Sequence, residues 1–312
     1  MSKYAFGVDV GGTTLKLGMF DVEGNLLDKW EIPTVTENEG ASILPDAAKS
    51  ILAKMEEKSV VKEEVAGVGI CVPGPVDEKG TINRAVNLNW GVFNIPEVFQ
   101  KYLDVPVKVG NDANVAAYGE MWKGSGAGAE HMVMVTLGTG VGGGIISSGK
   151  ILSGSTGSGG ELGHIHVEDN ETEECGCKNK GCLEQYASAT GVVRLAKRRL
   201  EKDDEPSVLR GQEITAKAVF DAVKAGDKVA TEIAWTFGEY LGKGLAIVAT
   251  TVNPTVFVIG GGVSKAGEIL FDFIAPACKK YSFHAARDVK FVLAGLGNDA
   301  GIYGAAGMVI NE

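Results

Sequence analysis

Short apolar runs alternate along the chain with segments in which apolar residues recur every three or four positions. The apolar runs predict buried strands at Tyr4–Val10, Leu15–Asp21, Val65–Val72, Val105–Val109, His131–Leu137, Val141–Ser147, Pro254–Ile259 and Val289–Leu293. The periodic segments predict helices at Ala41–Lys58, Asn111–Lys123, Gly191–Lys202, Thr215–Ala225, Asp227–Thr251 and Ala300–Ile310. Alternating strands and helices predict an α/β protein with layered sheets.

The opening pattern of the chain occurs a second time. Tyr4–Val10 is followed by a glycine-rich break, a second strand and a turn, and His131–Leu137 is followed by the same series. We interpret this recurrence as an internal structural duplication, with one copy in each of two lobes.

Both breaks have the composition of a phosphate-binding turn. Glycine makes up 44 of the 312 residues, about twice its usual share of roughly 7%, and it clusters at these turns and at Gly260, Gly261 and Gly262. The turn residues are Gly11, Gly12, Thr13 and Thr14 in the first copy and Gly138, Thr139 and Gly140 in the second. Glycine lets successive N–H groups point into one concavity that suits phosphate oxygens, and the threonines add hydroxyl donors. Two tight hairpins without a ligand are the alternative.

Neither turn matches the Walker motif or the dinucleotide-binding fingerprint. The chain lacks the G-x-x-x-x-G-K-[ST] motif, and each turn leads into a strand instead of the helix that a dinucleotide fold requires. Asp9 ends its strand just before the first turn, where its carboxylate could hold Mg²⁺ beside phosphates or cap the turn.

Charge and hydropathy limit the partners that we expect. The formal net charge is −10, which argues against nucleic acid as a partner. No apolar run has the length of a bilayer span, so we expect no membrane association. The N-terminal residues lead directly into a strand pattern, so we expect no signal peptide and a cytoplasmic location.

Three of the five cysteines lie close together on one segment. Cys175, Cys177 and Cys182 have the density of soft ligands that favours a structural Zn²⁺. The fourth ligand is expected to be His164 or His166, which share one face of a predicted strand. Three reduced, unliganded thiols are the alternative. The neighbouring charged residues, Glu168–Glu171 and Lys178–Lys180, are expected to face solvent, and Cys71 and Cys278 are expected in the core.

Several polar residues are candidates for a polyol site. Asp112 follows Asn111 where a strand meets a helix, and it is either a general base for a hydroxyl or an ordinary helix N-terminal acid. Glu161 and Glu184 flank the metal segment and would lie near a zinc-bound His164. Asn87 and Gly74 could complete the pocket. Surface glutamates and plain loop turns are the alternatives.

These motifs, in this order, resemble the ROK family of sugar kinases and sugar-responsive repressors. The resemblance extends from residue 4 to about residue 306, and its most specific part is the zinc signature. The segments that carry it are Asp9–Thr13, Pro73–Gly74, Gly110–Asn114, Gly138–Gly144, Gly160–His164, Cys175–Cys177 and Gly181–Glu184.

The resemblance implies an actin-like (ribonuclease H-like), two-lobed ATPase fold with a central cleft for the sugar. It implies a discontinuous small lobe, residues 1–117 plus 300–312, and a large lobe, residues 118–299, that carries the zinc loop. The resemblance also implies that Asp112 is the general base and that Gly260–Gly262 contact adenosine. The residues that it implies for sugar binding are Asn111, Glu161, His164 and Glu184. The histidine also binds zinc, which favours His164 over His166. A homodimer is implied as well.

Two further segments, Asn87–Trp90 and Gln185–Gly191, resemble the glucokinase branch. We therefore expect ATP-dependent phosphorylation of the glucose 6-hydroxyl, with Mg²⁺ on the phosphates. Fructose, N-acetylglucosamine, N-acetylmannosamine and allose are alternative substrates, and polyphosphate is an alternative donor.

A sugar-sensing transcriptional regulator is the alternative from a different class. We disfavour it because the kinase pattern begins by residue 4, which leaves no room for a DNA-binding domain. The sequence departs from the family pattern at Thr14, where many members have lysine, and at Lys178, where glycine is common. The first departure leaves the role of nearby Lys16 open.

Overall fold

The computed structural model describes residues 2–311, which form two compact units. The first unit comprises the described residues 2–130, 144–160 and 295–311, and the second comprises His131–Gly143 and Glu161–Ala294. The expected small lobe, 1–117 plus 300–312, falls inside the first unit, whereas 118–299 is divided between the two. The lobe boundaries that the resemblance implies remain a prediction.

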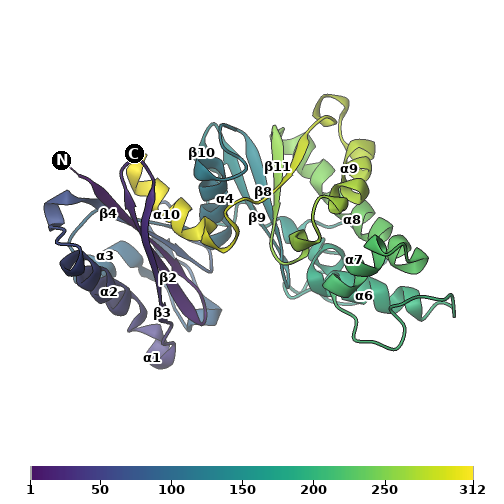
Figure 1. Cartoon of the computed structure of the whole chain (residues 1–312), viewed down its shortest axis with the longest axis horizontal. Helices are drawn as coiled ribbons and strands as arrows, with labels where there is room; N and C mark the ends of the chain where they lie inside the picture. The colour runs from purple at the N-terminus through teal and green to yellow at the C-terminus, as the bar shows by residue number, and fades with distance from the viewer. Residues whose placement is uncertain (1, 312) are drawn as a thin grey trace. The chain divides into compact units, whose positions relative to one another are not determined.

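The first unit is built on a five-stranded sheet with the order β3-β2-β1-β4-β7 (Figure 1). β1 pairs antiparallel with β2 and parallel with β4, which pairs parallel with β7. The strands are β1 (Tyr4–Val10), β2 (Thr14–Asp21), β3 (Leu26–Pro33), β4 (Val65–Val72) and β7 (Val107–Asn111), with a small sheet of β5 (Thr81–Ile82) and β6 (Phe93–Asn94). The helices are α1 (Glu37–Gly40), α2 (Ile43–Glu57), α3 (Ile95–Phe99), α4 (Asp112–Lys123) and α10 (Ala300–Ile310), with 3₁₀ turns η1 (Lys62–Glu64), η2 (Val86–Leu88) and η6 (Gly297–Asp299).

The second sheet has the order β10-β9-β8-β11-β12. Its strands are β8 (Met132–Leu137), β9 (Val141–Ser147), β10 (Lys150–Ile151), β11 (Val256–Gly260) and β12 (Lys290–Leu293). β8 and β9 are neighbours over a three-residue turn, and β11 pairs parallel with β8 and with β12. Each sheet therefore has a hairpin followed by parallel strands in the same order, which confirms the predicted duplication. One copy in each unit was also expected, but β10 and residues 144–147 of β9 belong to the first unit.

The remaining helices belong to the second unit. They are α5 (Glu184–Ala187), α6 (Ala189–Leu200), α7 (Ala216–Lys224), α8 (Lys228–Val252) and α9 (Ile269–Tyr281), with 3₁₀ turns η3 (Leu162–His164), η4 (Val263–Ala266) and η5 (His284–Ala286). Apart from the strand expected to carry His164 and His166, the predicted strands and helices are present, with ends that differ by a few residues. The sequence pattern did not predict α9, which contains Pro276, a residue that normally ends helices.

The C-terminal helix α10 lies unusually close to the elements around it. A side chain on Gly7 of β1 or Gly69 of β4 would collide with a backbone carbonyl of α10, and one on Gly304 of α10 would collide with a carbonyl of α4. Figure 1 shows α10 beside α4. Glycine at these positions lets the backbones approach each other, so α10 fixes the relative positions of β1, β4 and α4.

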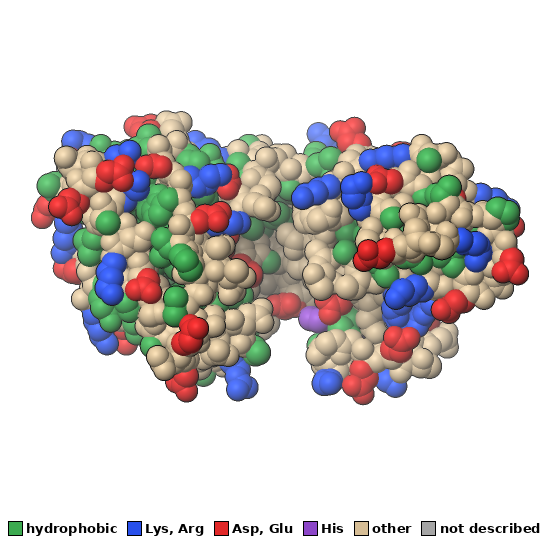
Figure 2. Space-filling view, turned by 60° about the horizontal axis from the view of Figure 1, so that its bottom comes forward, with side chains coloured by type: hydrophobic (Ala, Val, Ile, Leu, Met, Phe, Trp, Pro, Cys, Tyr) green, Lys and Arg blue, Asp and Glu red, His purple; other side chains and the backbone are tan. Residues whose placement is uncertain are grey.

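None of the helices within residues 2–311 is both long and apolar enough to cross a bilayer. On the face shown in Figure 2, acidic and basic side chains are interspersed.

We predict that Gly69→Ala destabilises the first unit, because the new methyl group would meet the Ala305 carbonyl in the packed interior. The expected loss is about 3 kcal/mol in the free energy of unfolding, measured by urea titration. Gly91→Ala is the matched control, since Gly91 is exposed and has open space around it. Equal stability of the two variants would contradict the close packing of α10.

Candidate functional site

The parallel strands of the first unit end at one edge of the sheet, where several predicted site residues lie. Asp9 pairs in register with Cys71, and Cys71 pairs with Gly110. Asn111 ends β7 and Asp112 begins α4 directly after it. The carboxyl ends of parallel strands in α/β proteins form the usual ligand-binding edge.

Asn111 fixes the beginning of α4. Its side-chain oxygen accepts hydrogen bonds from the amides of Ala113 (3.1 Å) and Asn114 (3.2 Å), which makes it the N-cap. Its side-chain nitrogen donates to the carbonyl of Gly74 (3.2 Å) and to Asp112 Oδ1 (3.0 Å). One asparagine thus joins Gly74 to Asp112. Both residues were predicted to contact the sugar, and Asp112 is exposed.

The Asp9 carboxylate is largely buried between β1 and α10. Cys71 Sγ donates a hydrogen bond to Asp9 Oδ1 over 3.4 Å, and the carboxylate lies against Gly301 in the first turn of α10. Burial raises the pKa of Asp9, while the Cys71 hydrogen bond and the charge of Lys16 act in the opposite direction. Burial, together with the charges of Asp9 and Asp112, raises the pKa of the Cys71 thiol well above its usual value.

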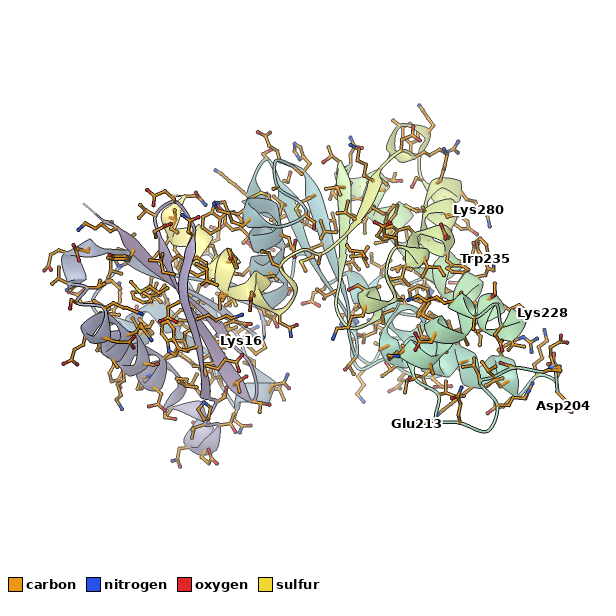
Figure 3. All side chains as sticks on the ribbon, viewed as in Figure 1. Lys16, Asp204, Glu213, Lys228, Trp235 and Lys280 are labelled. Carbon is orange, nitrogen blue, oxygen red and sulfur yellow. The ribbon has the colours of Figure 1, made fainter. Side chains whose placement is uncertain are left out.

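Lys16 of β2 is labelled in Figure 3. It is paired with Asp9 in the register of β1 and β2. Its Nζ donates to the carbonyl of Asn298 over 3.2 Å, just before α10. Lys16 therefore contributes positive charge near Asp9, although it is not at the position where many family members have lysine.

The first glycine-rich turn is closed by its own backbone. Gly11 N donates to Thr14 O (3.1 Å), and Thr34 N donates to Thr13 O (2.9 Å). The backbone carbonyl of Asn87 lies near Gly12, 4.0 Å from where a Cβ would be. The structure therefore brings Asn87 to the predicted phosphate turn.

The second glycine-rich turn is anchored in the same way within the second unit. Gly138 N donates to Gly140 O (3.0 Å), and Thr190 Oγ1 donates to Thr139 O (2.8 Å). Gly261, which follows β11, lies directly against the backbone of Leu137 at the end of β8, so that no side chain would fit there. The 138–140 and 260–262 glycines therefore lie at the same end of two neighbouring parallel strands.

Two pockets of the second unit adjoin these glycines. One, of about 340 Å³, is lined by Thr139, Gly140, Cys175, Glu184 and Arg194 among others, so it joins the phosphate turn to the cysteine segment. The other, of about 130 Å³, lies between α7 and η4 and is lined by Ala216, Phe220, Gly262 and Val263 among others.

The structure brings His164 together with all three cysteines of the predicted metal site. The four ligand atoms lie within 4.8 Å of one another, with Cys177 Sγ 3.6 Å from Cys182 Sγ and Cys175 Sγ 3.8 Å from His164 Nδ1. Bonds of about 2.3 Å to sulfur and about 2.0 Å to nitrogen at tetrahedral angles give edges of about 3.5–3.8 Å. The cluster therefore fits a zinc ion in both chemistry and size.

The segment that carries the histidines is not the predicted strand. His164 ends the short 3₁₀ turn η3, and His166 forms only an isolated bridge with Cys182. The His166 ring contacts Lys180 O (2.9 Å) and Asp169 Oδ1 (2.8 Å), so it is directed away from the cluster. The two histidines were expected to share one strand face, and that expectation is wrong because the backbone turns between them.

Glu184 links the cysteine cluster to the second glycine-rich turn. Its Oε1 accepts a hydrogen bond from Cys175 Sγ (3.0 Å), and its Oε2 accepts one from Val141 N (3.4 Å). Glu161 precedes η3, where its backbone carbonyl accepts a hydrogen bond from His164 N (3.2 Å), and its side chain is exposed.

Sequence reasoning missed one residue that anchors the metal segment. Glu171 was expected to face solvent, but its side chain is only 1% exposed. Burial by itself would raise its pKa, yet hydrogen bonds from Tyr186, the Glu173 amide and Arg194 outweigh burial and hold the pKa well below its usual range. Tyr186 and Arg194 lie on the helices after the metal segment, so no local pattern could have indicated this contact.

The sequence profile of the ROK family matches residues 5–312. The chain belongs to the ROK family. The glucokinase of Halalkalibacterium halodurans is 41% identical over 98% of this chain and 95% of that protein. The solved structure of a ROK family glucokinase from Streptomyces griseus, in complex with glucose and AMPPNP, is 34% identical with a TM-score of 0.76, and the likeness covers 99% of this chain and 100% of that one.

A ROK hexokinase from Thermus thermophilus has a TM-score of 0.80 and 31% identity, covering 97% of this chain and 96% of that one. These likenesses confirm the predicted α/β, actin-like fold class of this ROK protein. The roles of the individual site residues remain predictions.

We predict that the purified ROK protein contains one zinc ion per chain and that Cys177→Ser removes most of it. Loss of one of four ligands should weaken binding by more than the roughly 10- to 100-fold that follows from loss of an outer-shell partner. Plasma mass spectrometry measures the metal, and the melting temperature should fall with it. Cys278→Ser, which changes a buried cysteine outside the cluster, is the control. Unchanged zinc content in Cys177→Ser, or a zinc-free wild-type protein that takes up none, would contradict the metal site.

Proposed function

We propose that this protein is an ATP-dependent glucokinase, which transfers the terminal phosphoryl group of ATP to the 6-hydroxyl of glucose. The observation that carries the proposal is the likeness over nearly the whole chain to a glucokinase at 41% identity. The glucose and AMPPNP of the Streptomyces griseus structure support the same substrate class and donor. The polar residues described above are those that such a reaction requires.

Asp112 is the proposed general base. Its carboxylate would accept the proton of the 6-hydroxyl as that oxygen attacks phosphorus, the role that an aspartate has in other kinases. Hydrogen bonds from Asn111 and from the Ala113 amide (2.8 Å) orient the carboxylate before the substrate arrives.

The proposed sugar ligands are those that the sequence predicts: Gly74, Asn87, Asn111, Asp112, Glu161, His164 and Glu184. Carboxylates and side-chain amides can each take hydrogen bonds from hydroxyl groups in a fixed geometry, as a hexose with several hydroxyls requires. Hydrogen-bonding sites of this kind discriminate well between sugars, because a wrong sugar leaves a buried polar group unpaired.

The proposed donor site consists of the glycine-rich turns. The amides of Gly11, Gly12 and of the 138–140 turn, with the hydroxyls of Thr13, Thr14 and Thr139, would bind phosphate oxygens. Gly260, Gly261 and Gly262 would contact adenosine, and the small, mostly apolar pocket between α7 and η4 is suited to a flat base. Asp9 would hold Mg²⁺, which supplies neutralisation of the phosphate charge when it is bound.

A structural Zn²⁺ on His164, Cys175, Cys177 and Cys182 would hold the segment from η3 to α5 in place. The proposed sugar ligands Glu161 and Glu184 begin and end that segment, so the metal would orient them without taking part in the chemistry. We also propose that the enzyme acts in the cytoplasm, where ATP is available, and that it is a homodimer, as the family resemblance implies.

We predict that Asp112→Asn lowers kcat by roughly 10²- to 10⁴-fold, because the amide cannot accept the proton, while glucose binds with nearly unchanged affinity. A coupled assay of ADP release gives kcat, and calorimetry gives the dissociation constant for glucose. Asp46→Asn is the matched control, because Asp46 is likewise an acidic residue in the first turn of its helix, α2. Turnover near the wild-type value in Asp112→Asn would remove Asp112 as the base.

A further inference from the structure

We infer that Cys71 is a positioning residue for Asp9, whose carboxylate it holds in the orientation that binds the Mg²⁺–nucleotide. This inference rests on the proposed kinase function and gives Cys71 a role in the proposed donor site. Cys71 would not touch the substrates itself; it acts through the side chain of Asp9.

The strand register places the two side chains next to each other. Asp9 and Cys71 are paired residues of the parallel strands β1 and β4, so their side chains extend from the same face of the sheet. Cys71 Sγ lies 3.4 Å from Asp9 Oδ1, a normal distance for a thiol that donates a hydrogen bond, and Cys71 is fully buried. Water therefore does not compete for the thiol.

The other side of the same carboxylate is held by α10. Asp9 Oδ2 lies so close to Gly301 that a Cβ there would be 2.9 Å from it. The carboxylate is thus confined between the thiol of Cys71 and the backbone of α10. Lys16 attracts the carboxylate through its charge, but its Nζ donates a hydrogen bond to the Asn298 carbonyl. The Cys71 thiol supplies a directional contact to Asp9 Oδ1.

The surroundings of Cys71 explain why a small side chain with a donor suits this position. Its neighbours in the core are Val115 and Ala305, with Ile151 and Met308 beside them. A larger residue would press against α4 and α10, whereas alanine would fit but would leave Asp9 Oδ1 without this donor. Serine is nearly the same size and keeps a donor, so it separates the hydrogen bond from the packing.

A fixed carboxylate binds an ion better than a mobile one, because less side-chain freedom is lost on binding. We therefore expect Cys71→Ala to raise the Mg²⁺ concentration needed for half-maximal nucleotide binding by about three- to tenfold, the size of effect of one modest hydrogen bond. Cys71→Ser should remain within about twofold of the wild-type value.

The experiment measures binding without turnover. Zinc-loaded wild-type protein, Cys71→Ala and Cys71→Ser are titrated with AMPPNP by calorimetry over a series of Mg²⁺ concentrations, and melting temperatures are recorded. Cys278→Ala is the matched control: Cys278 is also a buried cysteine, but its neighbour is Ser282 Oγ at 3.7 Å, in the second unit. It should lose some stability and keep the wild-type Mg²⁺ dependence.

A shift in the Mg²⁺ midpoint for Cys71→Ala that is reversed in Cys71→Ser would support the inference. An unchanged midpoint in Cys71→Ala, or an equal shift in Cys278→Ala, would overturn it while leaving the kinase proposal intact. If the wild-type protein binds no AMPPNP at any Mg²⁺ concentration, the proposed donor site itself is wrong, and the inference fails with it.

Discussion

The close contact of α10 with β1, β4 and α4 is the constraint on which the first unit depends. Glycine at Gly7, Gly69 and Gly304 lets backbone meet backbone where any side chain would collide. This packing brings the last helix of the chain under the first strand and beside α4, although these elements are far apart in sequence. It adds a direct contact to the sheet register that already relates Asp9 to the beginning of α4 through β4 and β7.

The proposed chemistry uses the positions that this packing fixes. Asp9 lies against Gly301 of α10, and Asp112 begins the helix that α10 supports. In the second unit, three cysteines and His164 form a cluster, and Cys175 of this cluster is hydrogen-bonded to Glu184. These contacts stabilise the segment that ends at Glu184. Phosphoryl transfer depends mainly on positioning and on neutralising charge, so rigid placement of a few polar groups is what the fold contributes.

Much of this arrangement could be predicted from sequence, because it is local. Strand ends, glycine-rich turns and the cysteine spacing are short sequence patterns, each with a known physical cause. The repeat of strand, turn and strand predicted the two related sheets. What could not be predicted depends on contacts across the chain. Examples are the burial of Glu171 by later helices, the helix α9 around Pro276, and the thiol of Cys71 beside Asp9. Local sequence does not encode such partners.

The most direct test of the proposed glucokinase activity is the sugar specificity of zinc-loaded protein with Mg-ATP. ADP release is followed for glucose, fructose, mannose, N-acetylglucosamine and N-acetylmannosamine, and the phosphorylated position is determined by NMR. If the protein is a glucokinase, kcat/KM is highest for glucose, and the phosphate is on the 6-hydroxyl. A clear preference for another hexose would contradict the glucose assignment, and no ADP release with any of these sugars would contradict the kinase itself.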